Sequence, residues 1–157
     1  MAQTVEDQEE RGQGLLVRIS NEMVRAQKQF FGKGPTRAKS YMFDDLLLIV
    51  MRGGLTTAEK TMLEFGHPDQ VRQFRQMFEN EMTERLTTMV ENLTGRTVLS
   101  YQSQVMFDPD LVVEMFVFDS AGERDDRAAT AEGQLEDDST GEATDDDALD
   151  QPSTPGQ

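Results

Sequence analysis

The chain has 157 residues, 36% of them hydrophobic and 29% charged, a composition that fits one globular domain. The 30 acidic residues outnumber the 15 basic ones and give a net charge of −15, which disfavours nucleic-acid binding because phosphate backbones are repelled. The absence of cysteine excludes disulfides, thiolate nucleophiles and cysteine-based zinc sites.

The N-terminal segment 1–13 is polar and acidic, unlike the basic and apolar start of a signal peptide, and we expect it to be flexible. The longest uninterrupted apolar run, Leu46 to Met51, has six residues, whereas a membrane-spanning helix needs about 20. We therefore expect a cytoplasmic protein without direct membrane insertion, which reaches the membrane only through a protein partner.

The first predicted element is an amphipathic helix, because apolar residues recur at three- and four-residue spacing from Gly14 to Phe30. Gly32 is the expected C-terminal cap, since glycine accepts the positive φ that ends helices. Two runs follow, an alternating one over 37–43 and an apolar one over 46–51, joined by two aspartates. Such runs around a two-residue turn predict a β-hairpin.

A short helix is predicted to begin at Thr56, because Thr56 and Glu59 have the spacing of a capping box. Leu63 and Phe65 are its expected apolar anchors. His67 follows, and it is the single histidine of the chain. It is a candidate general base or metal ligand, but without a second histidine or a cysteine we favour a linker position beside a helix N-terminus.

The longest periodic segment runs from Asp69 to Asn92 and predicts a helix with one apolar stripe. The stripe is expected to form the core or a dimer seam, although its methionines would also suit an adaptable partner groove. The strands that follow, 97–107 and 111–118, form a second predicted hairpin around Pro109. Both faces of 111–118 are largely apolar, which indicates cover on both sides or an oligomer interface. The interface candidates are Phe74, Phe78, Met82, Met89, Phe116 and Phe118.

The predicted organisation is therefore a single α+β domain over 14–120, with element order α-β-β-α-α-β-β. Its two β-hairpins form a four-stranded antiparallel sheet with helices mainly on one face; strand order and domain swapping are left open. Segment 121–157 holds 12 acidic residues and two arginines but few large apolar ones, so we expect a disordered acidic tail.

Aspartates cluster at the predicted turns of the two hairpins. If the hairpin tips converge, they would form an oxygen-rich site for a cation such as Ca²⁺ or Mg²⁺. Aspartate is also favoured in turns for its own backbone hydrogen bonds, which is the alternative interpretation. The cation candidates are Asp44, Asp45, Asp108 and Asp110, with Asp119 nearby in the sequence.

Several short segments, in this order, resemble the motifs of one bacterial family. They are FGKGP (31–35), DLLLIV (45–50), GLTTAE (54–59), LTGRTV (93–98), DPD (108–110) and VEMFVF (113–118). The family is named after MpsC of a sodium-translocating, membrane-potential-generating system, and the resemblance covers about residues 10–120. It implies an accessory to membrane components linked to cation translocation and, in some relatives, inorganic-carbon uptake. It implies no catalytic residues and no cofactor.

Two functional hypotheses follow from the sequence and the resemblance. The first is a non-enzymatic adaptor, expected to be a homodimer, that docks through an apolar face on a membrane transport complex or another protein. The second is a cytoplasmic regulatory module that senses a ligand or a cation. An enzyme is disfavoured, because no nucleophile–base pair and no GxSxG elbow are recognisable in the sequence.

Overall fold

The computed structural model describes residues 4–120, and the predicted acidic tail over 121–157 lies outside these described residues. The α+β class and the order α-β-β-α-α-β-β are confirmed. The elements are α1 (Val5–Phe31), β1 (Arg37–Phe43), β2 (Leu46–Arg52), α2 (Thr57–Glu64), α3 (Pro68–Thr94), β3 (Val98–Met106) and β4 (Leu111–Phe118).

The strands form one antiparallel sheet in the order β1-β2-β4-β3. β1 and β2 are joined by a tight turn in which Asp44 has a φ of 44°, as the two-aspartate hairpin signal predicts. In the central pair Leu46 lies opposite Val117, and Arg52 lies opposite Leu111. This register places the β1–β2 turn at one end of the sheet and the β3–β4 turn at the other.

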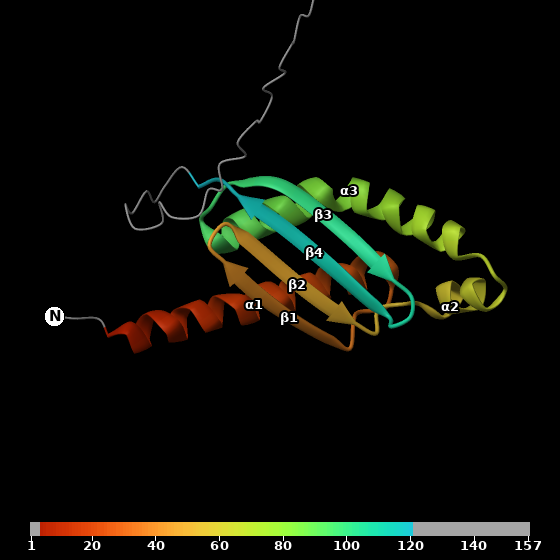
Figure 1. Ribbon diagram of the computed structural model, residues 1–157, viewed down its shortest axis with the longest axis horizontal. Coiled ribbons are helices and arrows are strands. Elements are labelled where there is room, and N and C mark those ends of the chain that lie inside the picture. Colours follow the sequence, from red (N-terminus) through yellow and green to blue (C-terminus); the bar gives the residue numbers. More distant parts are fainter. Residues whose placement is uncertain (1–3, 121–157) are drawn as a thin grey trace, which may run out of the picture. The chain divides into compact units, whose positions relative to one another are not determined.

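Helices α1 and α3 cover one face of the sheet, as Figure 1 shows from the side of the other face. α1 packs mainly on β1, α3 on β3, and the two helices contact each other. Strand residues that face the helices alternate with residues that face away from them. The core between sheet and helices consists of Ile19, Met23, Leu47, Ile49, Met51, Met82, Leu86, Val90, Val105, Val112, Phe116 and Phe118.

Two features of the helices differ from the prediction. α1 begins at Val5 and not at Gly14; because its first turns are fully exposed, they carry no apolar periodicity that sequence analysis could detect. Phe65, an expected anchor of α2, is 75% exposed, and the buried residue of that helix is Glu59. In the described part of the chain, no helix is long and apolar enough to cross a membrane.

Candidate functional site

Helix α3 directs two charged side chains into the protein. Arg75 and Glu79 are buried, in line with Val71 and Met82 at three- and four-residue spacing. The predicted apolar stripe of this helix contains Phe74, Phe78 and Met82 but not the charged residues that lie between them on the buried face. The three- and four-residue spacing from Val71 to Met82 would have indicated that Arg75 and Glu79 are buried, if charged residues had been allowed at core positions.

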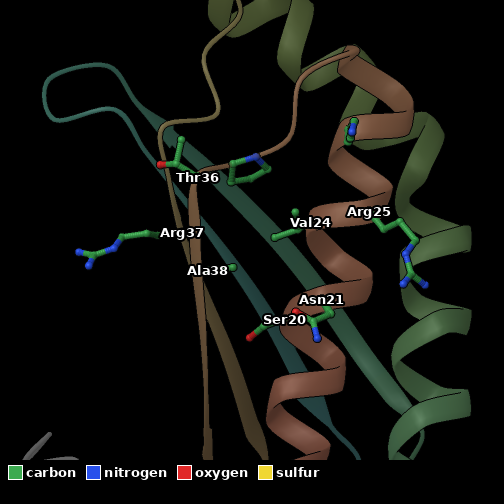
Figure 2. Close-up of a pocket in the computed structure, with 9 residues that line it drawn as sticks. Ser20, Asn21, Val24, Arg25, Thr36, Arg37 and Ala38 are labelled. Carbon is green, nitrogen blue, oxygen red and sulfur yellow. The ribbon is translucent and has the colours of Figure 1, made fainter.

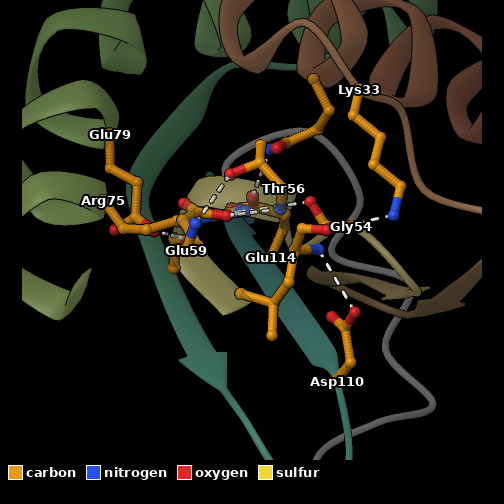
Figure 3. Close-up of polar contacts among 11 residues, drawn as sticks. Lys33, Gly54, Thr56, Glu59, Arg75, Glu79, Asp110 and Glu114 are labelled. Carbon is orange, nitrogen blue, oxygen red and sulfur yellow. Dashed lines mark hydrogen bonds and ion pairs between the residues drawn. The ribbon is translucent and has the colours of Figure 1, made fainter. Parts of the chain in front are cut away.

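Arg75 of α3 forms a buried ion pair with Glu59 of α2 and also contacts the β2–α2 connection and the end of α1 (Figure 3). Its Nε and Nη2 donate to the two carboxylate oxygens of Glu59, both at 2.7 Å, and Nη2 also donates to the carbonyl oxygen of Gly54 at 3.0 Å. The guanidinium lies 4.2 Å from the ring centroid of Phe31, at the end of α1. This bidentate geometry holds α2 and the β2–α2 connection against α3.

Glu59 serves this ion pair and the predicted capping box at once. Its Oε2 accepts a hydrogen bond from the Thr56 backbone N–H at 2.8 Å, and its own N–H donates to the Thr56 hydroxyl at 3.2 Å. The capping box is thus confirmed. Burial by itself raises the pKa of Glu59, but the hydrogen bonds from Arg75 and the Thr56 backbone outweigh it and lower the pKa below its usual value.

Two further carboxyl groups lie in the core with raised pKa values. Glu114, on β4, is 0% exposed; it accepts hydrogen bonds from the Tyr101 hydroxyl at 2.5 Å and the Gln27 amide at 3.3 Å. Burial raises the pKa of Glu114 to about 7, although the Tyr101 and Ser103 hydroxyls oppose the shift. Burial likewise raises the pKa of Glu79, which accepts from the Ser103 hydroxyl at 2.8 Å. Both carboxyl groups therefore hold a proton more readily than an exposed glutamate, and both lie between the sheet and the helices.

An apolar groove opens beside the Arg75–Glu59 pair, and we call it the phenylalanine groove. It has a volume of about 590 Å³, within the range of small-molecule pockets. Phe74 is 45% exposed here, and its ring contacts those of Phe31 and Phe78, with centroids 6.5 and 4.8 Å away. The groove is lined by Phe30, Phe31, Thr56, Ala58, Glu59, Met62, Gln70, Val71 and Phe74.

A second groove, of about 430 Å³, lies between α1 and the edge strand β1. Its lining includes Ser20, Asn21 and Val24 of α1, and Figure 2 shows Arg37 directed away from that helix. The Ser20 and Ser40 hydroxyls form a hydrogen bond of 2.7 Å between α1 and β1. This groove contains no arrangement of acid, base and nucleophile.

The cation candidates do not converge. Asp44 and Asp45 lie at one end of the sheet, where the Arg96 guanidinium binds the Asp45 carboxylate at 2.8 Å. Asp108 and Asp110 lie at the opposite end, where the Asp110 carboxylate accepts from the Leu55 N–H at 3.2 Å. The condition for a shared cation site, that the hairpin tips converge, is not met, because β2 runs antiparallel to β4 between them. Within residues 4–120, no group of three His, Cys, Asp or Glu side chains is placed to hold a metal.

The interface candidates fall into three groups. Met82, Phe116 and Phe118 are buried in the core of the protein itself. Phe78 and Met89 are half-buried against that core, and Phe74 lines the phenylalanine groove. His67 occupies the N-cap position of α3, is exposed, and makes no side-chain capping hydrogen bond.

A family model described as "Na+-translocating membrane potential-generating system (MpsC)" matches residues 13–120. No curated protein and no solved structure matches the chain. The matched residues include every strand, α2, α3 and most of α1.

Proposed function

The chain belongs to the MpsC family, and from this premise we propose that it is a non-enzymatic accessory domain of a membrane system for cation translocation or inorganic-carbon uptake. In this proposal it acts in the cytoplasm as a homodimer and reaches the membrane through a protein subunit. Support comes from the family match and from described helices that are too short or too polar to cross a membrane.

The observation that carries the adaptor role is the phenylalanine groove. Its aromatic and methionine side chains stay partly exposed although a core lies directly beneath them. Exposed aromatic residues around a pocket are typical of sites that receive an apolar anchor from a partner. The Arg75–Glu59 pair holds α1, α2 and α3 in place around the groove, so a partner would meet a largely preformed surface.

A photo-crosslinking amino acid at Phe74 tests this docking site in the full chain. The variant is expressed in native cells, irradiated and fractionated, and the joined protein in the membrane fraction is identified by mass spectrometry. The control carries the same amino acid at Glu84, an exposed position on α3 about 15 Å further along the helix.

We expect the Phe74 variant, and not the Glu84 variant, to be joined to an ion- or carbon-transport membrane subunit. Equal recovery from both positions would show that the groove is not the docking site. Recovery of the chain only in the cytosol, without any membrane subunit at either position, would argue against the accessory function itself.

A ligand- or cation-sensing module is the second candidate function, favoured by the size of the groove and by a buried carboxyl that titrates near neutrality. Thermal unfolding in the presence of cations, bicarbonate or nucleotides tests it. A shift in melting temperature that Phe74→Ala abolishes would place a ligand in the groove. No shift with any of these compounds would remove the sensing hypothesis.

A further inference from the structure

The face of the sheet that points away from α1 and α3 has no covering element among the described residues (Figure 1). We call it the bare sheet face. Its two central strands, β2 and β4, present apolar side chains to the outside. Along each strand these residues alternate with buried residues that face the helices. The central outward-facing residues are Leu46, Leu48, Val50, Val113, Met115 and Val117.

This pattern is unusual for a sheet face in contact with water. A one-sided antiparallel sheet normally alternates apolar residues inside with polar residues outside. Here β4 does the reverse at its one charged position, since Glu114 faces inward, while Val113 and Met115 face outward. Polar or amphipathic side chains occur at the edges, for example Lys39 and Tyr41 on β1 and Gln102 on β3. An apolar centre within a more polar rim is the anatomy of a protein–protein interface.

The charges on the bare sheet face are compatible with self-association. Its basic residues Arg37, Lys39 and Arg52 gather at one corner, and no outward-facing position of the four strands carries a carboxylate. A two-fold axis parallel to the strands brings β1 of one copy over β3 of the second, and β2 over β4. Two outward-facing rows of the register hold cations, and each cation then faces a neutral side chain of the second copy, as Lys39 would face Gln104. No cation lies directly opposite another cation across this interface.

The dimensions of the face also fit a dimer. Four strands of about seven residues give a footprint of roughly 19 by 24 Å at the usual strand spacing and rise. With side-chain relief, two such faces approach the lower end of specific interfaces, about 1,200 Å² in total. Two sheets stacked about 10 Å apart would form a β-sandwich with the helices on its outer sides. An interface of this size predicts an association that depends on protein concentration.

We propose that the bare sheet face binds a second copy of this chain, face to face, in a two-fold symmetric sandwich centred on β2 and β4. The inference rests on the homodimer of the proposed function and assigns its surface. It leaves the phenylalanine groove open on both copies, because the groove is lined by residues of α1, α2, α3 and the β2–α2 connection and by no residue of the four strands.

Light scattering coupled to size-exclusion chromatography, over a range of concentrations of the full chain, tests the proposal with Leu48→Glu. The matched control is Thr88→Glu, which adds the same charge at an exposed position of α3. Circular dichroism establishes that each variant is folded. We expect the wild type and Thr88→Glu to dimerise, and Leu48→Glu to raise the dissociation constant of the dimer about tenfold or more, because two carboxylates would be buried without partners.

A second measurement uses the absence of cysteine from the chain. Val50→Cys changes an outward-facing residue of β2 conservatively, and a short bismaleimide should link two such copies across the interface. Thr88→Cys should not be linked at the same protein concentration. This experiment decides the question even if Leu48→Glu does not fold.

The results separate this inference from the proposed function. A dimeric wild type whose association resists Leu48→Glu, or whose Val50→Cys variant is not linked, overturns the assignment of the surface and leaves the homodimer standing. A wild type that is monomeric at all concentrations overturns both. If that monomer sediments with vesicles of phosphatidylglycerol and Leu48→Glu does not, the bare sheet face binds lipid, which also refutes the proposal.

Discussion

Replacement of Glu114 by glutamine tests how much the ionisation of this buried carboxyl group changes the stability of the protein. Glutamine has nearly the same shape and keeps an oxygen that can accept from the Tyr101 hydroxyl, but it cannot ionise. Its amide group needs an acceptor, which Gln27 can supply by turning its carbonyl oxygen toward position 114. The substitution therefore removes a titration while it disturbs packing little.

The size of the expected change in the free energy of unfolding follows from the pKa of Glu114. Burial moves the pKa of Glu114 from 4.5 to about 7, and each pKa unit corresponds to about 1.4 kcal/mol. The native state keeps this proton at pH values where the unfolded chain has lost it, so stability is highest below pH 4.5 and falls as the pH rises toward 7. Ionisation within the core then costs up to about 3 kcal/mol at pH 8. The raised pKa of Glu79 acts in the same direction.

Urea unfolding of the full chain, followed by circular dichroism at fixed protein concentration between pH 5 and pH 8, measures this cost. At pH 5 we expect Glu114→Gln to equal the wild type or to be about 1 kcal/mol less stable, because one hydrogen bond is rearranged. At pH 8 we expect it to be more stable by up to about 3 kcal/mol. Glu84→Gln, at an exposed site, should keep the wild-type pH profile. Parallel profiles for Glu114→Gln and the wild type would refute the argument.

Two further predictions concern the stability of the domain. Arg75→Met should lower the free energy of unfolding by about 3–5 kcal/mol, because it leaves the buried Glu59 carboxylate without its partner; a loss below 1 kcal/mol in urea unfolding would show that water reaches this pair. Gly53→Ala should be more destabilising than Gly66→Ala in thermal unfolding. Both glycines have positive φ, 72° and 80°, which costs about 1–2 kcal/mol for alanine. A Cβ at residue 53 would also lie 2.5 Å from the Thr36 hydroxyl oxygen, whereas residue 66 has open space around it. Equal losses would mean that Thr36 moves aside freely.

Features set by neighbouring residues could be predicted from the sequence. The β1–β2 hairpin depends on two aspartates between apolar runs, and the start of α2 depends on a hydroxyl and a carboxylate three residues apart. The end of α1 depends on Gly32, whose φ is 76°. In each case the stabilising contact spans at most a few residues, so the local pattern contains the necessary information.

Features set by contacts between distant segments could not be predicted. The pairing of β2 with β4 places the hairpin tips at opposite ends of the sheet, and no local signal favours this order over the alternative that brings them together. The partners of the buried carboxyl groups are equally remote, since Gln27 and Glu114 are 87 positions apart. A charged residue within an apolar strand, such as Glu114 in LVVEMFVF, is nevertheless a usable signal of a buried polar contact.

The position of Glu114 also bears on how the two apolar surfaces are used. If the bare sheet face met only water, a strand with one charged residue would be expected to place that residue outside, where ionisation costs nothing. β4 instead buries the carboxyl and directs Val113 and Met115, which are half-buried, to the outside. The opposite orientation would expose Val112, Phe116 and Phe118, which belong to the core, so the larger apolar residues decide which face of β4 is buried. The aliphatic residues on the outward face are left for a partner to cover. The proposed two-fold dimer would provide such a partner. It would also present two phenylalanine grooves in fixed relation, so that two modest docking contacts would reinforce each other on an assembly with two binding sites.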